Sequence, residues 1–389
     1  MALQKRRFLL LYALASAGGA VAYVPFLTIL LPMRVTAMAG AEDLEWLAYA
    51  TVAGATAASL ANIAFGWASD RTGSRVPWIA AGLVASCGLL AAFAETRSVA
   101  ALVGLLIAWQ CALNMVLAPL AAWGGDCVPD HQKGTLGGLL TFAPAAGAAA
   151  GVLVTLPGLA TADERLWLVS GLVALCVAPV LLFGRPRAFP HLMREEPGIA
   201  ERMRPSGHIA SMWLARLLMQ VAEAALFAFL YFWLRSIDPA MTDARVAQVF
   251  GAILIGAVPL ALAAGSWADR RGRPFVPLTL TAAGATAGLL AMACAPGLGI
   301  ALAGYVIFGL NASMFLSLHS AQTLRVLPRA ANRGRDLGYF NLTNTVPSVA
   351  VPWVTLALVP AFGFAGLFVA LAGCALGATL LLARLPRAV

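Results

Sequence analysis

The chain of 389 residues is 61% hydrophobic and only 11% charged, whereas about a quarter of the residues of a soluble domain are charged. This deficit excludes a water-soluble globular protein and predicts a chain that crosses a membrane many times. The net charge of +9 does not indicate nucleic-acid binding, because the basic residues lie in short loops between apolar runs and not on one face of a soluble fold.

Apolar runs of about 20 residues have the length that crosses a bilayer as a helix, and twelve such runs follow one another along the chain. The expected fold class is therefore an all-α membrane protein with twelve transmembrane helices. The six cysteines lie in or beside these runs without a paired spacing, so we interpret them as buried apolar residues and not as disulfides or metal ligands. In chain order the runs cover approximately 8–32, 44–69, 76–95, 99–123, 134–157, 165–184, 209–234, 244–268, 274–295, 297–320, 335–358 and 361–384.

The longest polar stretch divides these runs into two sets of six. We expect an N-terminal six-helix bundle over 1–184, a cytoplasmic linker over 185–208 and a C-terminal six-helix bundle over 209–389. Of the 26 Lys and Arg residues, 20 fall in loops on one side, five fall on the other and Arg216 lies in a helix. Cytoplasmic loops carry the excess of Lys and Arg, so both termini are predicted to be cytoplasmic.

One short motif occurs twice, 199 residues apart. The copies are GWASDRTGSR over 66–75 and GSWADRRGR over 265–273, and each lies between two apolar runs. The last glycine of each copy suits a left-handed turn, and Asp70 and Asp269 can accept hydrogen bonds from the exposed N–H groups of a helix N-terminus. A repeat at this spacing predicts a duplicated membrane bundle with two pseudo-symmetric halves.

The paired G-x-x-x-D-R-x-G turns, the twelve runs and the long central loop resemble the major facilitator superfamily of secondary transporters. The resemblance covers essentially the whole chain. It implies the major facilitator fold and transport by alternating access, in which a solute binds between the halves and is exposed to each side in turn.

The resemblance also implies where the two motif aspartates lie. Asp70 would face the start of the eleventh helix near 334–336, and Asp269 would face the start of the fifth helix near Gly134. These contacts would stabilise the outward-open state, with Asp126 as a partner of Arg75; the alternative is that the charges only set topology. The expected gating residues are Gly66, Asp70, Arg71, Gly73, Arg75, Asp126, Gly265, Asp269, Arg270, Gly272 and Arg273.

A second resemblance lies in the run LGYFNLTNTVP over 337–347. It is similar to the corresponding segment of sucrose-transporter-like and glycoside-pentoside-hexuronide cation symporters, which implies a sugar or glycoside as substrate. Proton-coupled members of the sucrose group have a carboxylate in the first helix, and the first run of this chain has none.

Ionisable residues within membrane helices are costly and usually functional. Arg216 and Glu223 lie well inside the seventh run, and with Gln220 they occupy positions i, i+4 and i+7 on one helical face. We expect these three residues to act in coupling, with Glu223 as the proton carrier. The alternative is a structural network in which Gln220 bridges Arg216 and Glu223.

Uncharged polar residues in other runs point to a neutral, hydroxyl-rich ligand, since an anion would favour more basic residues. The resemblance places helices one, four, seven and ten, and in some branches eleven, around the central cavity. Amides also bond membrane helices to one another, which is the alternative for each residue. The expected substrate-binding residues are Tyr23, Gln110, Asn114, Asn311, Asn341, Asn344 and Thr345.

These observations together predict a transporter and not an enzyme or an ATP-driven pump, because no nucleotide-binding loop, metal cluster or catalytic dyad occurs in the sequence. We expect a monomer in the lipid bilayer of a cell inner membrane, without a cofactor, that takes up a sugar or glycoside with protons, or with sodium as the other coupling ion. Two alternatives stay open: a drug or lipophile efflux carrier of the same fold, and a non-transporting membrane assembly factor.

Overall fold

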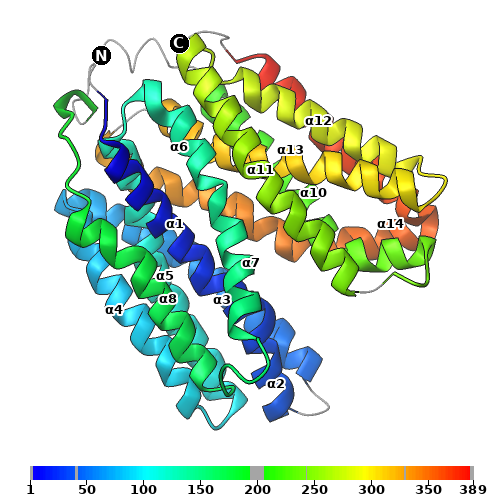
Figure 1. Cartoon of the computed structure of the whole chain (residues 1–389), viewed down its shortest axis with the longest axis horizontal. Helices are drawn as coiled ribbons and strands as arrows, with labels where there is room; N and C mark the ends of the chain where they lie inside the picture. The colour runs from blue at the N-terminus through cyan, green and yellow to red at the C-terminus, as the bar shows by residue number, and fades with distance from the viewer. Residues whose placement is uncertain (1–2, 40–42, 193–205, 242, 328–329, 386–389) are drawn as a thin grey trace. The chain divides into compact units, whose positions relative to one another are not determined.

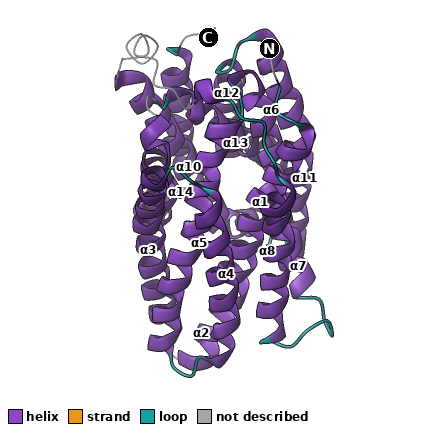
Figure 2. Cartoon of the chain, turned by 90° about the vertical axis from the view of Figure 1, so that its left-hand side faces the viewer, coloured by secondary structure: helices purple, strands orange, loops and turns teal. Residues whose placement is uncertain are grey.

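The computed structural model describes residues 3–39, 43–192, 206–241, 243–327 and 330–385, and every regular element in these ranges is helical (Figure 2). Among the described residues, eleven helices are long and apolar enough to cross a membrane. The expected all-α membrane class is therefore confirmed, and the chain is a multi-pass membrane protein.

The helices fall into two compact units. The first comprises Met1–Pro129, Phe142–Glu195 and Arg329–Leu342. Within it, α5 packs against α3 and α4, while α8 packs against α1 and α4 (Figure 1). Its helices are α1 (Arg6–Pro25), α2 (Leu31–Ala39), α3 (Asp43–Thr72), α4 (Val76–Ala92), α5 (Val99–Cys127), α7 (Phe142–Val154) and α8 (Glu164–Phe183).

The second unit comprises Asp130–Thr141, Glu196–Pro328 and Thr343–Val389. Within it, α13 packs against α10, α11 and α12, and α6 packs against α11 and α13. The helices α6 (Lys133–Leu140), α10 (Ser206–Ile237), α11 (Asp243–Arg271), α12 (Val276–Ala293) and α13 (Leu298–Val326) lie in this unit, and α14 (Arg333–Ala383) begins in the first unit and continues in the second.

Two short segments cluster away from their neighbours in sequence. Residues 130–141 belong to the second unit, although the chain before and after them belongs to the first, and residues 329–342 show the reverse pattern. Helix α6 ends at Leu140 because Pro144 has no N–H to donate to the carbonyl of Leu140. Part of the linker expected over 185–208, residues 193–205, lies outside the described residues.

Local sequence accounts for where several helices begin. The Ser98 hydroxyl accepts a hydrogen bond from the N–H of Ala101 and caps α5. Pro77 and Pro277 lie in the first turns of α4 and α12, where a missing N–H costs no intrahelical bond. The loops at the ends of the two motifs are short, since they cover only residues 73–75 and 272–275.

The structure corrects two predicted helix ends. The first helical stretch continues from Arg6 to Ala39, because a π-helical turn at Phe26–Leu30 follows Pro25 and keeps the helix going. The break between the runs 335–358 and 361–384 lies at Gly363, where φ is 65°, because α14 continues through Pro360 and is interrupted only there. The fixed φ of proline fits a helix, whereas a positive φ does not.

Candidate functional site

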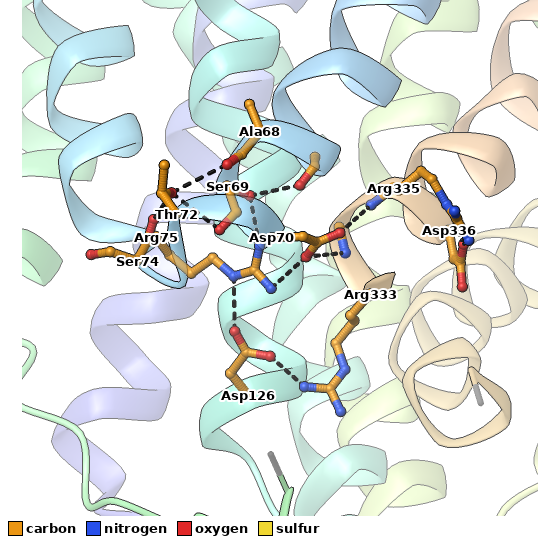
Figure 3. A network of polar contacts seen from close by, with 12 residues as sticks. Ala68, Ser69, Asp70, Thr72, Ser74, Arg75, Asp126, Arg333, Arg335 and Asp336 are labelled. Atoms are coloured by element: carbon orange, nitrogen blue, oxygen red, sulfur yellow. Dashed lines mark hydrogen bonds and ion pairs between the residues drawn. The ribbon is translucent and has the colours of Figure 1, made fainter. Parts of the chain in front are cut away.

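A buried cluster of four charged side chains lies where α3 and α5 end and α14 begins (Figure 3). Asp70 accepts hydrogen bonds from the backbone N–H groups of Gly334 and Arg335, each at 2.9 Å. Arg75 bridges two acids, with its Nη2 2.7 Å from Asp70 and its Nε 2.9 Å from Asp126. We call Asp70, Arg75, Asp126 and Arg333 the Asp70 cluster.

The Asp70 cluster is balanced in charge, because it contains two acids and two arginines. Arg333 completes it through an ion pair with Asp126, and all four side chains are at most 10% exposed. Burial alone lowers the pKa of Arg75, but the carboxylates of Asp126 and Asp70 outweigh burial and raise it. The Arg75 guanidinium therefore stays charged, as a buried ion pair requires.

A second cluster occupies the equivalent place in the other motif copy. Asp269 accepts hydrogen bonds from the backbone N–H groups of Gly134 at 2.9 Å and Thr135 at 2.7 Å, and from the Thr135 hydroxyl. Arg325 lies 3.3 Å from the Asp269 carboxylate. We call Asp269, Thr135 and Arg325 the Asp269 cluster; in both clusters an aspartate binds the positive N-terminal end of a helix.

Glycines allow the close backbone contact beside each aspartate. A Cβ on Gly66 would lie 2.3 Å from the carbonyl oxygen of Gly334, and a Cβ on Gly265 would lie 2.0 Å from that of Gly134. A side chain at either position would therefore force the two helices apart. The later motif glycines, Gly73 and Gly272, both have φ of 61° and terminate α3 and α11 in left-handed turns.

Three of the expected gating arginines lie outside both clusters. Arg71 stacks over the ring of Trp67 at 4.6 Å and is exposed, as are Arg270 and Arg273. These three arginines are placed to contact solvent or lipid headgroups, so the geometry separates them from the buried aspartates.

A third polar cluster lies within the second unit and is centred on Arg216 of α10. Its guanidinium donates from Nη1 to the hydroxyl of Ser320 at 2.9 Å, and from Nε and Nη2 to Oδ1 of Asn344 at 3.4 and 3.3 Å. Gln220 donates to the same oxygen at 2.5 Å, and Nδ1 of His319 lies 3.4 Å from Nη1. We call Arg216, Gln220, His319, Ser320 and Asn344 the Arg216 cluster.

Glu223 lies beside this cluster without a direct bond to it. Its carboxylate is close enough to Arg216 and Tyr305 to act on them electrostatically, but none of the ion pairs among the described residues joins it to Arg216. Gln220, which bridges Arg216 and Glu223 in the structural alternative, donates to Asn344 of α14. The three coupling residues therefore share a face of α10, while the direct contacts of Arg216 and Gln220 run to other helices.

The predicted substrate-binding residues of the first half lie in different surroundings. Gln110 and Asn114 are buried, and Asn114 accepts a hydrogen bond at 2.8 Å from Asn62 of α3. This contact bonds α5 to α3, which is the helix-bonding alternative for an amide. Tyr23 is 39% exposed.

The predicted residues of the second half gather partly around Arg216. Asn344 belongs to the Arg216 cluster, and Thr345 follows it in α14. Asn311 donates to the carbonyl of Ile307 in its own helix, at 2.8 Å, while its amide also lies against Gly284. Asn341 lies just before the point at which α14 passes into the second unit.

Sequence reasoning missed several partners in these clusters. Arg325 and Arg333 were counted only as loop charges, and Ser320 was not singled out. Their position next to the motif helices in a duplicated chain is a signal that could have pointed to the two arginines. Among the described residues, no group of three His, Cys, Asp or Glu side chains could hold a metal ion.

No protein-family model matches the chain, and no curated protein matches it. Solved structures match it over nearly its whole length. The human organic anion transporter MFSD10 is 15% identical, with a TM-score of 0.79 over 97% of this chain and 99% of that one. The Escherichia coli fucose:proton symporter FucP is also 15% identical, with a TM-score of 0.74 and 97% of each chain covered. A bacterial homologue of the iron transporter ferroportin, in an outward-facing state, is 14% identical, with a TM-score of 0.72 over 97% of this chain and 98% of that one.

Proposed function

We propose that this chain, which has the major facilitator fold, is a secondary transporter that moves a small solute across the membrane by alternating access. The observation that carries this proposal is the pair of aspartate clusters. Each holds the first turn of a helix by a charge-assisted contact that is lost if the helix moves by a few ångströms. A transporter needs contacts of this kind, because the same ends must be held in one state and released in the other.

The covalent path of the chain makes these contacts suitable as a gate. Helix α6 is joined directly to α7, so a movement of the first unit would pull on the contacts that Asp269 makes with α6. Helix α14 likewise connects the contact of Asp70 to the second unit. We infer that both clusters are formed in the outward-open state and break when the cytoplasmic side opens.

For coupling, we propose that Glu223 carries a proton. A carboxylate held in a permanent ion pair stays ionised, whereas one near an arginine without a direct bond can exchange protons during a transport cycle. Sodium is the other candidate ion for the same carboxylate.

For the solute, the run over 337–347 and the uncharged polar residues favour a sugar or glycoside. The proteins of the same fold are an organic anion transporter, a homologue of an iron transporter and a fucose:proton symporter. Their likeness supports transport but does not select among these solutes. We place the protein in the inner membrane with both termini in the cytoplasm.

The test of coupling uses proteoliposomes that contain a trapped pH dye, to which sugars, glycosides and sugar acids are added one at a time. We expect one solute to acidify the interior, and we expect Glu223→Gln to abolish solute accumulation while solute exchange continues. Exchange needs only the alternating cycle, whereas accumulation also needs the proton.

The matched control is Glu45→Gln, since Glu45 is an exposed acid whose carboxylate accepts a hydrogen bond from the hydroxyl of Tyr49 in its own helix. It should transport like the wild type. Unchanged solute accumulation in Glu223→Gln would show that Glu223 does not couple transport to protons. A folded protein that moves no solute would favour the assembly-factor alternative.

A further inference from the structure

The guanidinium of Arg216 differs from those of the two aspartate clusters in its partners. Arg75 and Arg325 each meet a carboxylate, whereas every described hydrogen-bond partner of Arg216 is neutral: an amide oxygen, a hydroxyl, a carbonyl oxygen and an imidazole nitrogen. Arg216 is partly buried, and burial of a charged group is costly when no opposite charge meets it. An arginine in this setting is well suited to a charged ligand.

The neighbouring histidine adds no second positive charge. Nε2 of His319 lies 2.9 Å from the carbonyl oxygen of Met212, which can only accept, so Nε2 carries the hydrogen. Nδ1 lies 3.1 Å from the hydroxyl of Thr323, which can donate or accept, and 3.4 Å from Nη1 of Arg216, which can only donate. A neutral ring with its hydrogen on Nε2 satisfies all of these contacts and orients the guanidinium.

One edge of the guanidinium is weakly satisfied. Nε and Nη2 of Arg216 both reach the single oxygen Oδ1 of Asn344, at 3.4 and 3.3 Å, and Gln220 donates to that same oxygen at 2.5 Å. Three donors therefore converge on an atom that has two lone pairs. A carboxylate has two oxygens at the spacing of this edge and binds it with two parallel hydrogen bonds.

The edge is also accessible. Asn344 is an exposed residue of α14, and its side chain is the group that a ligand oxygen would displace. Once displaced, the amides of Asn344 and Gln220 would be available to hydroxyl groups of the same ligand. We propose that the Nε–Nη2 edge of Arg216 binds the carboxylate of the transported solute, which is therefore a hydroxylated acid of the sugar-acid class.

This inference rests on the proposed transport function and narrows its substrate. It is tested first by binding, with the purified full chain in detergent and a thermal-melting readout. The probes are acids paired with their uncharged amides: D-glucuronate with D-glucuronamide, D-gluconate with D-gluconamide, and lactate with lactamide as a small hydroxy acid. At least one acid should bind about tenfold more tightly than its amide, because only the acid can pair with the guanidinium.

Three variants of the cluster test the role of the guanidinium edge. Arg216→Gln should remove the preference for the acid, and Arg216→Lys should keep part of it. Asn344→Asp places a fixed carboxylate on the same edge, so it should raise the melting temperature and block the acid. The control Arg235→Gln changes an exposed arginine at the far end of α10 and should bind as the wild type does.

Several results would overturn the inference. They are equal binding of every acid and its amide, an acid preference that survives Arg216→Gln or Asn344→Asp, and the absence of binding by all three acids. Counterflow in proteoliposomes distinguishes failure of the carboxylate site from failure of the proposed transport function. Transport of a neutral sugar without any acid would refute only the carboxylate site, whereas acid binding without movement of any solute would refute only transport.

Discussion

At the scale of single residues, one glycine of each motif copy determines how closely two helices approach. Gly66 and Gly265 bring helix backbones into direct contact, which places the aspartate of each motif within reach of N–H groups on the facing helix. The glycine and the aspartate of each motif therefore act together. If the two helix backbones did not approach closely, the carboxylate would not reach the N–H groups of the facing helix.

We predict that Gly66→Ala will destabilise the protein. The added Cβ would lie 2.3 Å from a carbonyl oxygen, and overpacking of this kind costs about 1–3 kcal/mol. The measurement is thermal melting in detergent, with Gly88→Ala as the control because a Cβ on Gly88 meets nothing within 4 Å. The control should be neutral or slightly stabilising, since alanine favours a helix over glycine. Equal melting of the two variants would show that the close contact does not matter for stability.

At the scale of elements, α6 depends on its cap more than the longer helices do. It has eight residues, and so short a helix is marginal without tertiary contacts. Its first N–H groups donate hydrogen bonds to Asp269 of α11, while Gly137 and Gly138 pack against backbone atoms of α13 and α11. A cap supplied by another helix makes the position of α6 sensitive to that helix.

We predict that Asp269→Asn will weaken the attachment of α6 by about 1–2 kcal/mol, the upper range for loss of a cap. The N–H groups of Gly134 and Thr135 reach different oxygens of the carboxylate, Oδ1 and Oδ2. Asparagine keeps only one of these oxygens, so one N–H group would face the amide N–H group of the side chain. It also leaves the buried Arg325 without its acid. Hydrogen exchange of the amides in 133–140 measures the effect.

Arg270→Gln is the control for this prediction, because Arg270 belongs to the same motif but is exposed. It should leave exchange in 133–140 unchanged. If the amides of 133–140 exchanged no faster in Asp269→Asn than in Arg270→Gln, the capping contact would contribute nothing to the stability of α6.

Sequence reasoning could predict the elements and the contacts that depend on repetition. The duplicated motif indicated both aspartates, and the family resemblance indicated the helix starts that they face. It could not predict that Asp126 binds Arg333 while Arg325, 199 residues after Asp126, has the opposite charge and binds Asp269 directly. From the sequence, the loop arginines could only be counted for the topology. Their ion-pair partners depend on where α5 and α13 end, which the sequence pattern does not show.

The contacts of the Arg216 cluster could not be predicted from the sequence for a related reason. Helical periodicity shows which residues share a face of α10, so Gln220 and Glu223 were natural partners for Arg216. The contacts that form depend on which side chains α13 and α14 bring to that face, and those helices are about 100 residues or more away in sequence. Periodicity within one helix carries no information on them.

At the scale of the whole molecule, the orientation in the membrane follows from the distribution of Lys and Arg. With the N-terminus in the cytoplasm, 20 of these residues lie on the cytoplasmic side and five on the other. Acids contribute little to orientation, so this imbalance alone sets the expected topology. The Asp70 and Asp269 clusters would then both lie at the cytoplasmic ends of their helices, where a gate to the cell interior must be.

We predict that single cysteines on opposite sides will label differently in intact cells. Arg97→Cys lies between α4 and α5 and Ser74→Cys lies between α3 and α4, and both positions are exposed. In a background whose six native cysteines are replaced by alanine, a membrane-impermeant maleimide should label position 97 directly and position 74 only after permeabilisation. The reverse pattern would place the aspartate clusters on the outer side. They would then close the outward path, and the state that they stabilise would be the inward-open one.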